Sequence, residues 1–318
     1  MDLIYTNAKK VDQGIIADYA FDLSYGATEN DFEITIGADE AMLEAGSFVY
    51  MDGTEYGGMV GGLKASTNGT TITYKGRTWH GIMNGKVLEP DAGENHLIVS
   101  GDAHEVLSFL IARMGLSGLF VVAKNLSGVN ISSYKFHRYC KGYDGVADML
   151  ADNGGKLKMV WEDRAVYLSA EPIADYTESP IDGDIASLTV EQNKDKVNHL
   201  ICLGKGNLAE REVIHLYIDQ FGRIGDVQYY TGLDEIADTY ENADSDDLRG
   251  DGIKKFSELR KTDKAEIDLT ETDGLSYDIG DIVGASELNS GITVVEAVKQ
   301  KIVKIKNGVV STEYKTGG

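Results

Sequence analysis

VNHLICLGKGNLAEREVIHLYI, residues 197–218, is the stretch that says most about the fold. Two runs rich in apolar and β-branched residues, 197–203 and 213–218, flank the turn-forming Gly204-Lys205-Gly206-Asn207. This spacing predicts two strands that pair through the turn. Apolar side chains fall on both alternate sets of the second run, so we expect both faces of the pair to be buried within a sheet domain.

Length and composition limit the class of protein. A chain of 318 residues is longer than one ordinary domain, which predicts two or three domains. Its 37 glycines, 17 tyrosines and 3 prolines are typical of a β-rich protein with many tight turns. No apolar run approaches the ~20 residues that cross a bilayer, and the N-terminus does not resemble a signal peptide. We therefore expect no membrane insertion and synthesis in a cytoplasm.

The net charge of −22 is the most unusual feature of the composition. A surface this acidic repels phosphate groups, which argues against nucleic-acid binding by charge attraction. The charge either serves solubility or forms a surface that nucleic acid passes without adhering. The two cysteines, Cys140 and Cys202, lack the spacing of metal ligands, and they argue against both a disulfide scaffold and a zinc site.

Strand and helix signals divide the chain into three predicted domains. Residues 1–98 alternate short strands, one of them at 78–83, with turns such as Asp52-Gly53 and Asn68-Gly69, which predicts a β-sandwich or small barrel. Residues 99–186 mix helices with strands. The spacing of apolar residues there predicts one helix at 103–114, with Asp102 as its N-cap, and a second at 143–151, followed by a β-hairpin.

Residues 187–318 return to strands and form the third predicted domain. Its part at about 219–262 is an acidic loop followed by a short helix. The closing hairpin, with its turn at Asn307-Gly308, carries lysines 299, 301, 304, 306 and 315, often in alternation with apolar residues, so we expect a cationic stripe on its exposed face. Gly61 and Gly85 are separated by the same interval as Gly284 and Gly308. This weak repeat either arises by chance or means that two copies of one β-module flank the mixed domain.

Each pattern with possible chemistry also has a simpler explanation. His104-Glu105 lacks the second histidine of a zinc-protease helix, and Gly204-x-Gly206 lacks the third glycine of a dinucleotide-binding turn. The aspartates 244, 246, 247 and 251 resemble half of a calcium loop without its bidentate glutamate, so we favour a solvated acidic loop. Carboxylate pairs of the glycosidase type stay open, because 52 acidic residues bring some pairs together by chance. The sequence thus predicts no enzymatic activity, catalytic residue, cofactor or metal site.

Several motifs are informative through their order and spacing. The N-terminal part contains Asp18-Tyr19, Phe21-Asp22-Leu23 and Glu29-Asn30-Asp31-Phe32, followed by Tyr74-x-Gly76-Arg77-Thr78-Trp79-x-Gly81. Taken alone, Gly76–Gly81 is best explained as a strand with Trp79 in the core. The second half contains VNHL at 197–200, GKG at 204–206, VIHLY at 213–217, YDIGDIVG at 277–284 and KIKNG at 304–308. Together these motifs resemble the baseplate or tail-tip hub proteins of tailed bacteriophages and prophages, in their siphophage-type branch.

The resemblance implies a fold, an assembly and a set of structural residues. The fold is mainly β, with two tube-type β-barrel modules flanking a mixed α/β domain. The assembly is a homotrimer in the virion tail, which adapts the sixfold tail tube to the threefold tip and lets DNA pass without tight binding. Its neighbours are a tail-tube or distal-tail ring protein on one side and tail-tip or fibre proteins on the other. The signature residues are Gly76, Arg77, Trp79, Asn198, His199, Gly204, Gly206, Gly280, Asp281 and Gly284.

An alternative function from another class is a carbohydrate-binding or carbohydrate-active β-protein of the tail tip. Such a protein uses exposed aromatic rings as stacking platforms for sugars. Trp79 and Trp161, together with tyrosines, are the available rings, and Trp161 beside the turn Glu162-Asp163-Arg164 is the best candidate. Because the chain ends soon after its last predicted hairpin, we expect no separate domain that degrades the cell wall.

Overall fold

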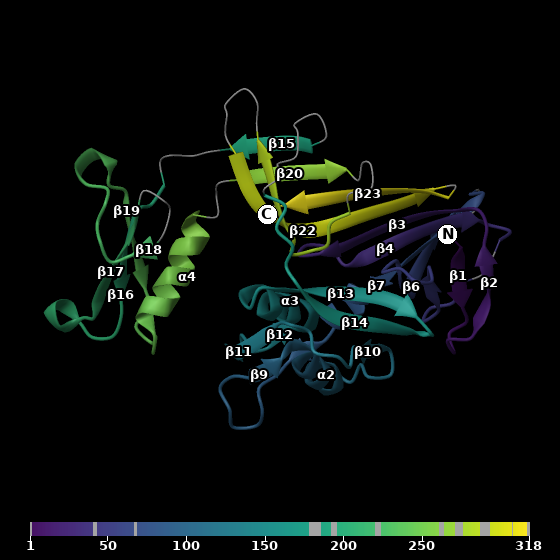
Figure 1. Ribbon diagram of the computed structural model, residues 1–318, viewed down its shortest axis with the longest axis horizontal. Helices are drawn as coiled ribbons and strands as arrows, with labels where there is room; N and C mark the ends of the chain where they lie inside the picture. Colours follow the sequence, from purple (N-terminus) through teal and green to yellow (C-terminus); the bar gives the residue numbers. More distant parts are fainter. Residues whose placement is uncertain are drawn as a thin grey trace. The chain divides into compact units, whose positions relative to one another are not determined.

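The computed structural model describes residues 2–40, 43–66, 69–177, 186–191, 196–219, 224–260, 264–270, 276–286, 293–306 and 308–316. The chain forms two compact units, a larger one from Met1–Leu188 and Glu266–Gly317 and a smaller one from Thr189–Ala265. Strands dominate the described residues and helices are few (Figure 1). The predicted class, mainly β with an α+β insertion, is therefore confirmed.

The main sheet of the larger unit joins strands from the two ends of the chain. Its order is β15-β20-β23-β22-β3-β4-β7-β6-β5-β1-β2, and β21 pairs with β22 outside this path. The bounds of these strands are β1 (Leu3–Thr6), β2 (Asp12–Ile16), β3 (Tyr19–Gly26), β4 (Asp31–Gly37), β5 (Phe48–Tyr50), β6 (Gly57–Ala65), β7 (Thr71–Thr78), β15 (Ala186–Glu191), β20 (Lys264–Thr270), β21 (Ile282–Ser286), β22 (Thr293–Lys306) and β23 (Val309–Thr316).

The centre of this sheet is the antiparallel pair of β22 and β3, whose register runs from Gln300↔Gly26 to Lys306↔Ala20. Alternate side chains of the two strands point to one face and form an apolar core with their neighbours. That core includes Phe21, Leu23, Phe32, Ile34, Val303 and Ile305, all nearly inaccessible to solvent. The closing strands are therefore held to the N-terminal strands both by the hydrogen-bond ladder and by a shared core.

An α+β part lies between the N-terminal and closing strands in the sequence. Its sheet has the order β10-β14-β13, and two short ladders pair β9 with β11 and β8 with β12. The bounds are β8 (Val87–Leu88), β9 (Ile98–Asp102), α2 (Ala103–Arg113), β10 (Phe120–Val122), β11 (Asn130–Lys135), β12 (Cys140–Lys141), α3 (Gly142–Asp152), β13 (Gly155–Glu162) and β14 (Ala165–Pro172).

The two predicted helices and the predicted hairpin of this part are confirmed. The Asp102 carboxylate accepts a hydrogen bond from His104 N at 2.9 Å, so it caps α2 as expected. The apolar faces of α2 and α3 share one core with Met159 and Val166 of the β13–β14 hairpin. The spacing of apolar residues was sufficient to predict both helices, because each helix buries a single apolar stripe.

The predicted strand at 78–83 is wrong, because residues from Trp79 form the helix α1 (Trp79–Asn84). Thr78 has extended backbone angles, and its hydroxyl accepts a hydrogen bond from Gly81 N at 3.3 Å, as an N-cap residue does. A threonine, an aromatic and an isoleucine favour a strand locally. Here the cap and the burial of Trp79 outweigh that preference, while the prediction that Trp79 lies in the core is confirmed.

The smaller unit is a four-stranded sheet of order β18-β17-β16-β19 with one helix, α4, packed on it. Its elements are β16 (His199–Leu203), η1 (Leu208–Glu210), β17 (Val213–Ile218), β18 (Ile224–Gly225), η2 (Gly232–Asp234), β19 (Ala237–Glu241) and α4 (Leu248–Arg260). The predicted pairing of β16 with β17 is confirmed, with Leu200 opposite Leu216. Burial of both faces is wrong: Leu216 and Ile218 face the core, whereas Val213 and His215 on the other face are exposed.

The predicted cationic stripe is confirmed only in part, because Lys301 is only 4% exposed and Lys299 is half-buried. The pairing of β22 with β23 is regular from Gln300 to Lys306, and Lys301 lies an odd number of residues from Lys304 and Lys306, so strand alternation places it on the opposite face, with Val303 and Ile305. The side chain of Lys301 therefore turns inward next to Tyr314, while Lys304, Lys306 and Lys315 stay exposed.

The boundaries of the three predicted domains can be compared with the two compact units. Strand β22 pairs with β3 of the first predicted domain, and β20, β21 and β23 join the same sheet through β22, instead of forming a body with the rest of the third predicted domain. The two intervals of the weak repeat differ in structure, because the first contains helix α1, whereas the residues described between 284 and 306 in the second lie in strands β21 and β22. The division into two barrel modules thus stays a prediction. The turn residues Asn68 and Asn307 lie outside the described residues. Among the helices described, none has the length and apolarity needed to cross a bilayer.

Candidate functional site

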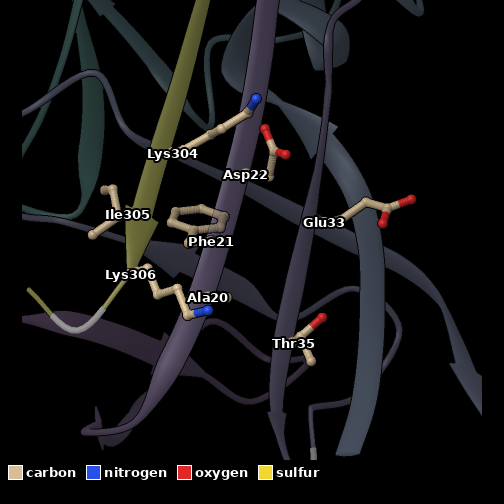
Figure 2. Close-up of a pocket in the computed structure, with 8 residues that line it drawn as sticks. All are labelled: Ala20, Phe21, Asp22, Glu33, Thr35, Lys304, Ile305 and Lys306. Atoms are coloured by element: carbon tan, nitrogen blue, oxygen red, sulfur yellow. The ribbon is translucent and has the colours of Figure 1, made fainter. Parts of the chain in front are cut away.

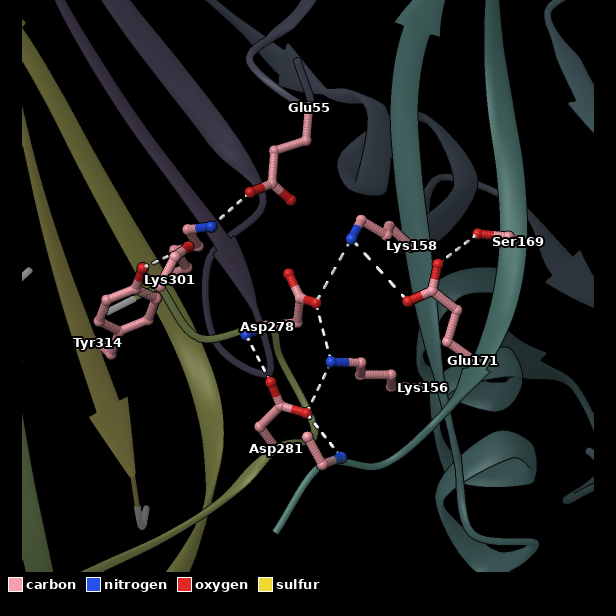
Figure 3. Close-up of polar contacts among 11 residues, drawn as sticks. Glu55, Lys156, Lys158, Ser169, Glu171, Asp278, Asp281, Lys301 and Tyr314 are labelled. Atoms are coloured by element: carbon pink, nitrogen blue, oxygen red, sulfur yellow. Dashed lines mark hydrogen bonds and ion pairs between the residues drawn. The ribbon is translucent and has the colours of Figure 1, made fainter. Parts of the chain in front are cut away.

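The larger unit contains a cluster of buried and half-buried charged and polar side chains where three parts of the chain meet. Lys156 comes from β13 of the α+β part, Glu55 from the loop between β5 and β6, and Asp278, Asp281, Gln300 and Lys301 from the closing segment. We call these six residues the seam cluster. Figure 3 shows the carboxylates and amino groups of five of them, all but Gln300, pointing toward one another between the closing strands and the β13–β14 hairpin.

Asp281 is the centre of the seam cluster and is 1% exposed. Its Oδ1 accepts hydrogen bonds from Lys156 Nζ at 2.7 Å and from Ala174 N at 3.0 Å. Its Oδ2 accepts a bond from Asp278 N at 2.9 Å. A carboxylate that is removed from water needs such donors, because an unpaired buried charge is very costly. Asp281 therefore ties the α+β part to the turn that precedes β21.

Gly280 allows the backbone turn that positions Asp281. Its φ of +101° lies in the region that residues with a side chain rarely adopt, and a Cβ there would lie 3.1 Å from Lys156 Cβ. Gly280 N donates to Val298 O and Val298 N donates to Asp281 O, both at 2.8 Å. The turn is thus fixed to β22 on one side and to Lys156 on the other.

The pKa values of Lys156 and Asp278 reflect this pairing. Burial alone would lower the pKa of Lys156, but its hydrogen bonds to Asp278 and Asp281 outweigh burial and raise the pKa. Burial would raise the pKa of Asp278, but Lys156, at 2.8 Å, outweighs it and lowers the pKa. Both groups therefore stay charged over the neutral pH range. Lys158 lies 3.8 Å from Asp278 and extends the network toward the surface.

Lys301 and Glu55 form a second buried ion pair in the seam cluster. Burial alone would lower the pKa of Lys301, but the negative charge of Glu55 and the ring hydroxyls of Tyr314 and Tyr56 raise it well above its ordinary value. The Lys301 Nζ also lies 5.4 Å from the centre of the Tyr314 ring. This pair joins β22 to the β5–β6 loop.

Gln300 connects the seam cluster to strand β3 and to the turn that follows it. Its Nε2 donates to Ser24 Oγ at 2.7 Å and to Glu29 O at 2.9 Å, and its Oε1 accepts from Thr28 N at 3.0 Å. The buried amide thereby satisfies backbone groups in the turn between β3 and β4. That turn contains Asn30, whose side chain bonds Gly26 through both its amide atoms. The Glu29-Asn30 motif of the sequence thus has a structural explanation.

His80 is a buried imidazole close to Lys301. Its ring stacks on Tyr25 with a centroid distance of 4.5 Å, and its Nδ1 has no hydrogen-bond partner among the described residues. Burial, with a smaller contribution from the charge of Lys301, lowers the pKa of His80 to about 3. The folded protein therefore holds His80 neutral, whereas the unfolded chain takes up a proton below the ordinary value of 6.5.

Acidification should therefore destabilise the larger unit through His80. Because the pKa of His80 is lowered in the folded protein, its contribution to the free energy of unfolding is fully present above pH 6.5 and is lost as the pH falls toward 3. Between about pH 7 and about pH 5 we expect the free energy of unfolding to fall by roughly 2 kcal/mol more in the wild type than in His80→Phe. Urea unfolding followed by tryptophan fluorescence measures this difference. Equal losses in the two proteins would contradict a neutral His80.

The ten signature residues lie in three separate places and do not form a single site. Gly76 and Arg77 are in β7 and Trp79 begins α1; a Cβ on Gly76 would lie 2.3 Å from Met59 O and 2.4 Å from Phe32 Cζ, so strand and ring approach too closely for a side chain. Arg77 is exposed opposite Asp31. Asp281 belongs to the seam cluster and Gly280 precedes it, while Gly284 of β21 pairs with Val295 of β22. The remaining residues, Asn198, His199, Gly204 and Gly206, belong to the smaller unit.

In the smaller unit, Asn198 and His199 hold a loop and the two glycines shape a turn. Asn198 Nδ2 donates to Asp234 O at 2.7 Å, and His199 Nδ1 lies 2.7 Å from Glu235 Oε1. Gly204 N donates to Glu212 O at 2.8 Å across the β16–β17 turn, in which Gly206 has a φ of +97°. Sequence reasoning missed Lys156, Glu55 and Gln300 of the seam cluster, because they lie outside the quoted motifs and their partners are far away in the chain.

The outer face of the main sheet carries a shallow hollow of about 280 Å³ (Figure 2). In register across it lie Lys304 of β22, Asp22 of β3 and Glu33 of β4. Burial, then the neighbouring carboxylates, raise the pKa of Asp22 against the opposing effect of Lys304. The hollow is therefore a polar surface on which a lysine of β22 lies beside carboxylates of β3 and β4.

Two further observations concern the binding of metal ions and of sugars. Within the described ranges, no group of three or more His, Cys, Asp or Glu side chains is placed to bind a metal ion. Trp79 and Trp161 are 0% and 3% exposed, and they stack on each other with a centroid distance of 4.9 Å. The expectation that Trp161 could serve as a sugar-stacking platform is therefore wrong, because its ring is used inside the core.

Comparison with known proteins gives likenesses of structure only. No protein-family model and no curated protein sequence matches the chain. Among solved structures, it is similar to the 43 kDa tail protein of prophage MuSo2 from Shewanella oneidensis, with a TM-score of 0.61, 12% identity and coverage of 99% of this chain and 98% of that one. It is similar to prophage tail protein gp18 from Listeria monocytogenes EGD-e, with a TM-score of 0.58, 13% identity and coverage of 100% and 94%.

A third likeness is to a chain of the phage P2 baseplate in its activated conformation. The TM-score is 0.53, the identity is 10%, and the alignment covers 100% of this chain and 99% of that chain. The likeness extends over almost the full length of each of the three chains. The protein therefore has the fold of phage and prophage tail proteins, and the resemblance found in the motifs is confirmed at the level of the fold.

Proposed function

We propose that a chain with this fold is a structural protein of a phage or prophage tail tip, placed in the baseplate of the virion tail. The single observation that carries the proposal is the likeness to tail and baseplate proteins over nearly the whole of each chain. A match to one module alone would fit any protein that had acquired that module. A match that includes the N-terminal strands, the α+β part and the closing strands favours the same role for the whole chain.

The assembly that fits this role is a homotrimeric ring around a channel, joining a sixfold tail tube to a threefold tip. Ring closure requires heterologous contacts that close after three copies. The seam cluster supports such a role because a ring subunit must hold its parts in fixed geometry. In this proposal DNA passes the channel without tight binding, consistent with the net charge of −22. A tail-tube or distal-tail ring protein lies on one side, and tip or fibre proteins lie on the other.

Sedimentation equilibrium of the purified chain, over a range of concentrations, tests the ring. We expect a species of three chains, whereas a dimer at every concentration would contradict the ring. Immunogold labelling of purified tails then tests the location, and labelling restricted to the tip is expected. The proposal assigns the protein no enzymatic activity. Turnover of peptidoglycan by the purified chain, lost on substitution of one Asp or Glu, would contradict that part.

A further inference from the structure

The smaller unit presents an unusual concentration of exposed apolar side chains. Among the described residues, the three most exposed large apolar side chains are Leu233 at 104%, Leu208 at 95% and Val227 at 81%. All three belong to Thr189–Ala265, the smaller of the two units. Single exposed apolar residues are common, but several of them within one short segment mark an interaction surface.

Two of these three residues lie in one loop, which connects β18 to β19 and which we call the 226–236 loop. It carries Val227, Tyr229 and Leu233, and Tyr229 is also exposed. The third, Leu208, lies in the turn between β16 and β17. Because β19 starts opposite His199, at the beginning of β16, the 226–236 loop and Leu208 are at opposite ends of the same sheet. Leu208 is thus an internal reference with similar exposure.

The 226–236 loop is held firmly although its apolar side chains are exposed. Asn198 bonds its end through both amide atoms, with Nδ2 donating to Asp234 O at 2.7 Å and Oδ1 accepting from Ile236 N at 3.0 Å. Glu235 lies 2.7 Å from His199 Nδ1 and accepts from Gln228 Nε2 at 2.9 Å.

The start of the loop is fixed as well, by an ion pair between Asp226 and Arg249 of α4. These contacts give the loop one defined shape before any partner binds. A surface that is ordered in advance loses little conformational entropy on binding, which increases its affinity. An exposed apolar loop that is fixed in this way is suited to docking.

The charges around the loop indicate the chemistry of its partner. Residues 224–241 contain five carboxylates and neither lysine nor arginine: Asp226, Asp234, Glu235, Asp238 and Glu241. Electrostatic complementarity favours a partner with a basic rim, and the apolar side chains require an apolar contact surface. A second copy of this chain, with a net charge of −22, is a poor match for an acidic loop.

We propose that the 226–236 loop is a docking surface for a different protein of the tail, one with an apolar contact surface rimmed by lysine or arginine. This inference rests on the proposed function, since it takes the partner from the tail. Val227 and Leu233 make the apolar contact. Asp226, Glu235 and Glu241 pair with Arg249, His199 and Arg211 inside the unit, so Asp234 and Asp238 are the carboxylates that face the basic rim. Asn198 and His199, two of the signature residues, act as positioning residues that hold the loop in shape.

The test uses tails assembled by the phage or prophage that encodes the chain, supplied with the wild type, Leu233→Asp, Val227→Asp or the matched control Leu208→Asp. Far-ultraviolet circular dichroism and the melting temperature first establish that each variant folds. Replacement of a central, fully buried interface residue weakens an interface by about tenfold or more. We expect incorporation of Leu233→Asp and Val227→Asp into purified tails to drop by that order, with Leu208→Asp incorporated like the wild type.

Hydroxyl-radical footprinting of the wild type supplies the second measurement. We expect the 226–236 loop to be exposed in the isolated chain and protected in tails, with Leu208 unchanged. Normal incorporation of both loop variants would overturn the docking surface while leaving the proposed function intact. Protection of the loop that grows with the concentration of the isolated chain would identify a second copy as the occupant and overturn the proposed partner. Absence of the wild type from tails would overturn the proposed function together with this inference.

Discussion

Replacement of Asp281 by alanine should lower the free energy of unfolding of the larger unit by about 3–5 kcal/mol, the cost of removing one partner from a buried ion pair. The carboxylate is 1% exposed and accepts from Lys156 Nζ, Ala174 N and Asp278 N. Without it, the two backbone donors lose their acceptor and Lys156 keeps only Asp278. Water cannot easily replace the carboxylate at a site that is closed to solvent.

Urea unfolding followed by tryptophan fluorescence measures this loss, because both tryptophans, Trp79 and Trp161, belong to the larger unit. The matched control is Glu171→Ala, which removes a half-exposed carboxylate 3.9 Å from Lys158. An exposed pair contributes little, so the control should differ from the wild type by less than about 1 kcal/mol. A loss for Asp281→Ala no larger than that of the control would mean that the seam does not hold the closing segment.

The importance of Asp281 shows what sequence alone can and cannot reveal. Asp281 and Gly280 were both part of an informative motif. Its partner Lys156 is 125 residues away in the chain, in a strand whose lysines look like ordinary surface residues. Local patterns do not encode which distant strand faces which. The ion pair could therefore be found only from the tertiary structure.

Helices α2 and α3 illustrate the opposite case. Each has one apolar stripe at helical spacing, and the stripe alone determines which side chains enter the core. The β13–β14 hairpin was equally accessible, because its two strands are adjacent in the sequence. The pairing of β22 with β3 was not, since it joins residues from opposite ends of the chain. That long-range ladder places the closing strands in the larger unit, and no local signal specified it.

The signature residues taken from the resemblance have different structural roles. Gly76 permits a close approach of strand and ring, Asp281 binds Lys156, and Asn198 fixes a loop. A motif gives no indication of which of these tasks a residue performs. The structure separates them because burial, backbone angles and hydrogen bonds differ at each position. Asn198 and His199, for example, lie outside the 226–236 loop and hold it in shape, a role that the motif alone did not suggest.

Replacement of Trp79 by alanine is the second change for which we expect a loss of about 3–5 kcal/mol, the usual cost of deleting a large buried aromatic side chain. Trp79 is 0% exposed, stacks on Trp161 at 4.9 Å and meets the edge of Phe48 at 5.4 Å. It thereby connects β5 of the N-terminal strands with the β13–β14 hairpin of the α+β part. Removal of the indole leaves a cavity between two parts that the seam cluster joins elsewhere.

The phenylalanine variant separates ring packing from the polar atom of the indole. Trp79 Nε1 is buried and has no hydrogen-bond partner among the described residues, so Trp79→Phe removes an unsatisfied donor along with part of the ring. We therefore expect Trp79→Phe to lower the free energy of unfolding clearly less than Trp79→Ala does. Tyr167→Ala, at a 37% exposed position in β14 of the β13–β14 hairpin, should lower it still less. In Trp79→Ala the fluorescence of Trp161 should shift to longer wavelength, because water reaches a ring that was covered. Equal stability of all three variants, without that shift, would show that the two parts of the larger unit are held together without this aromatic contact.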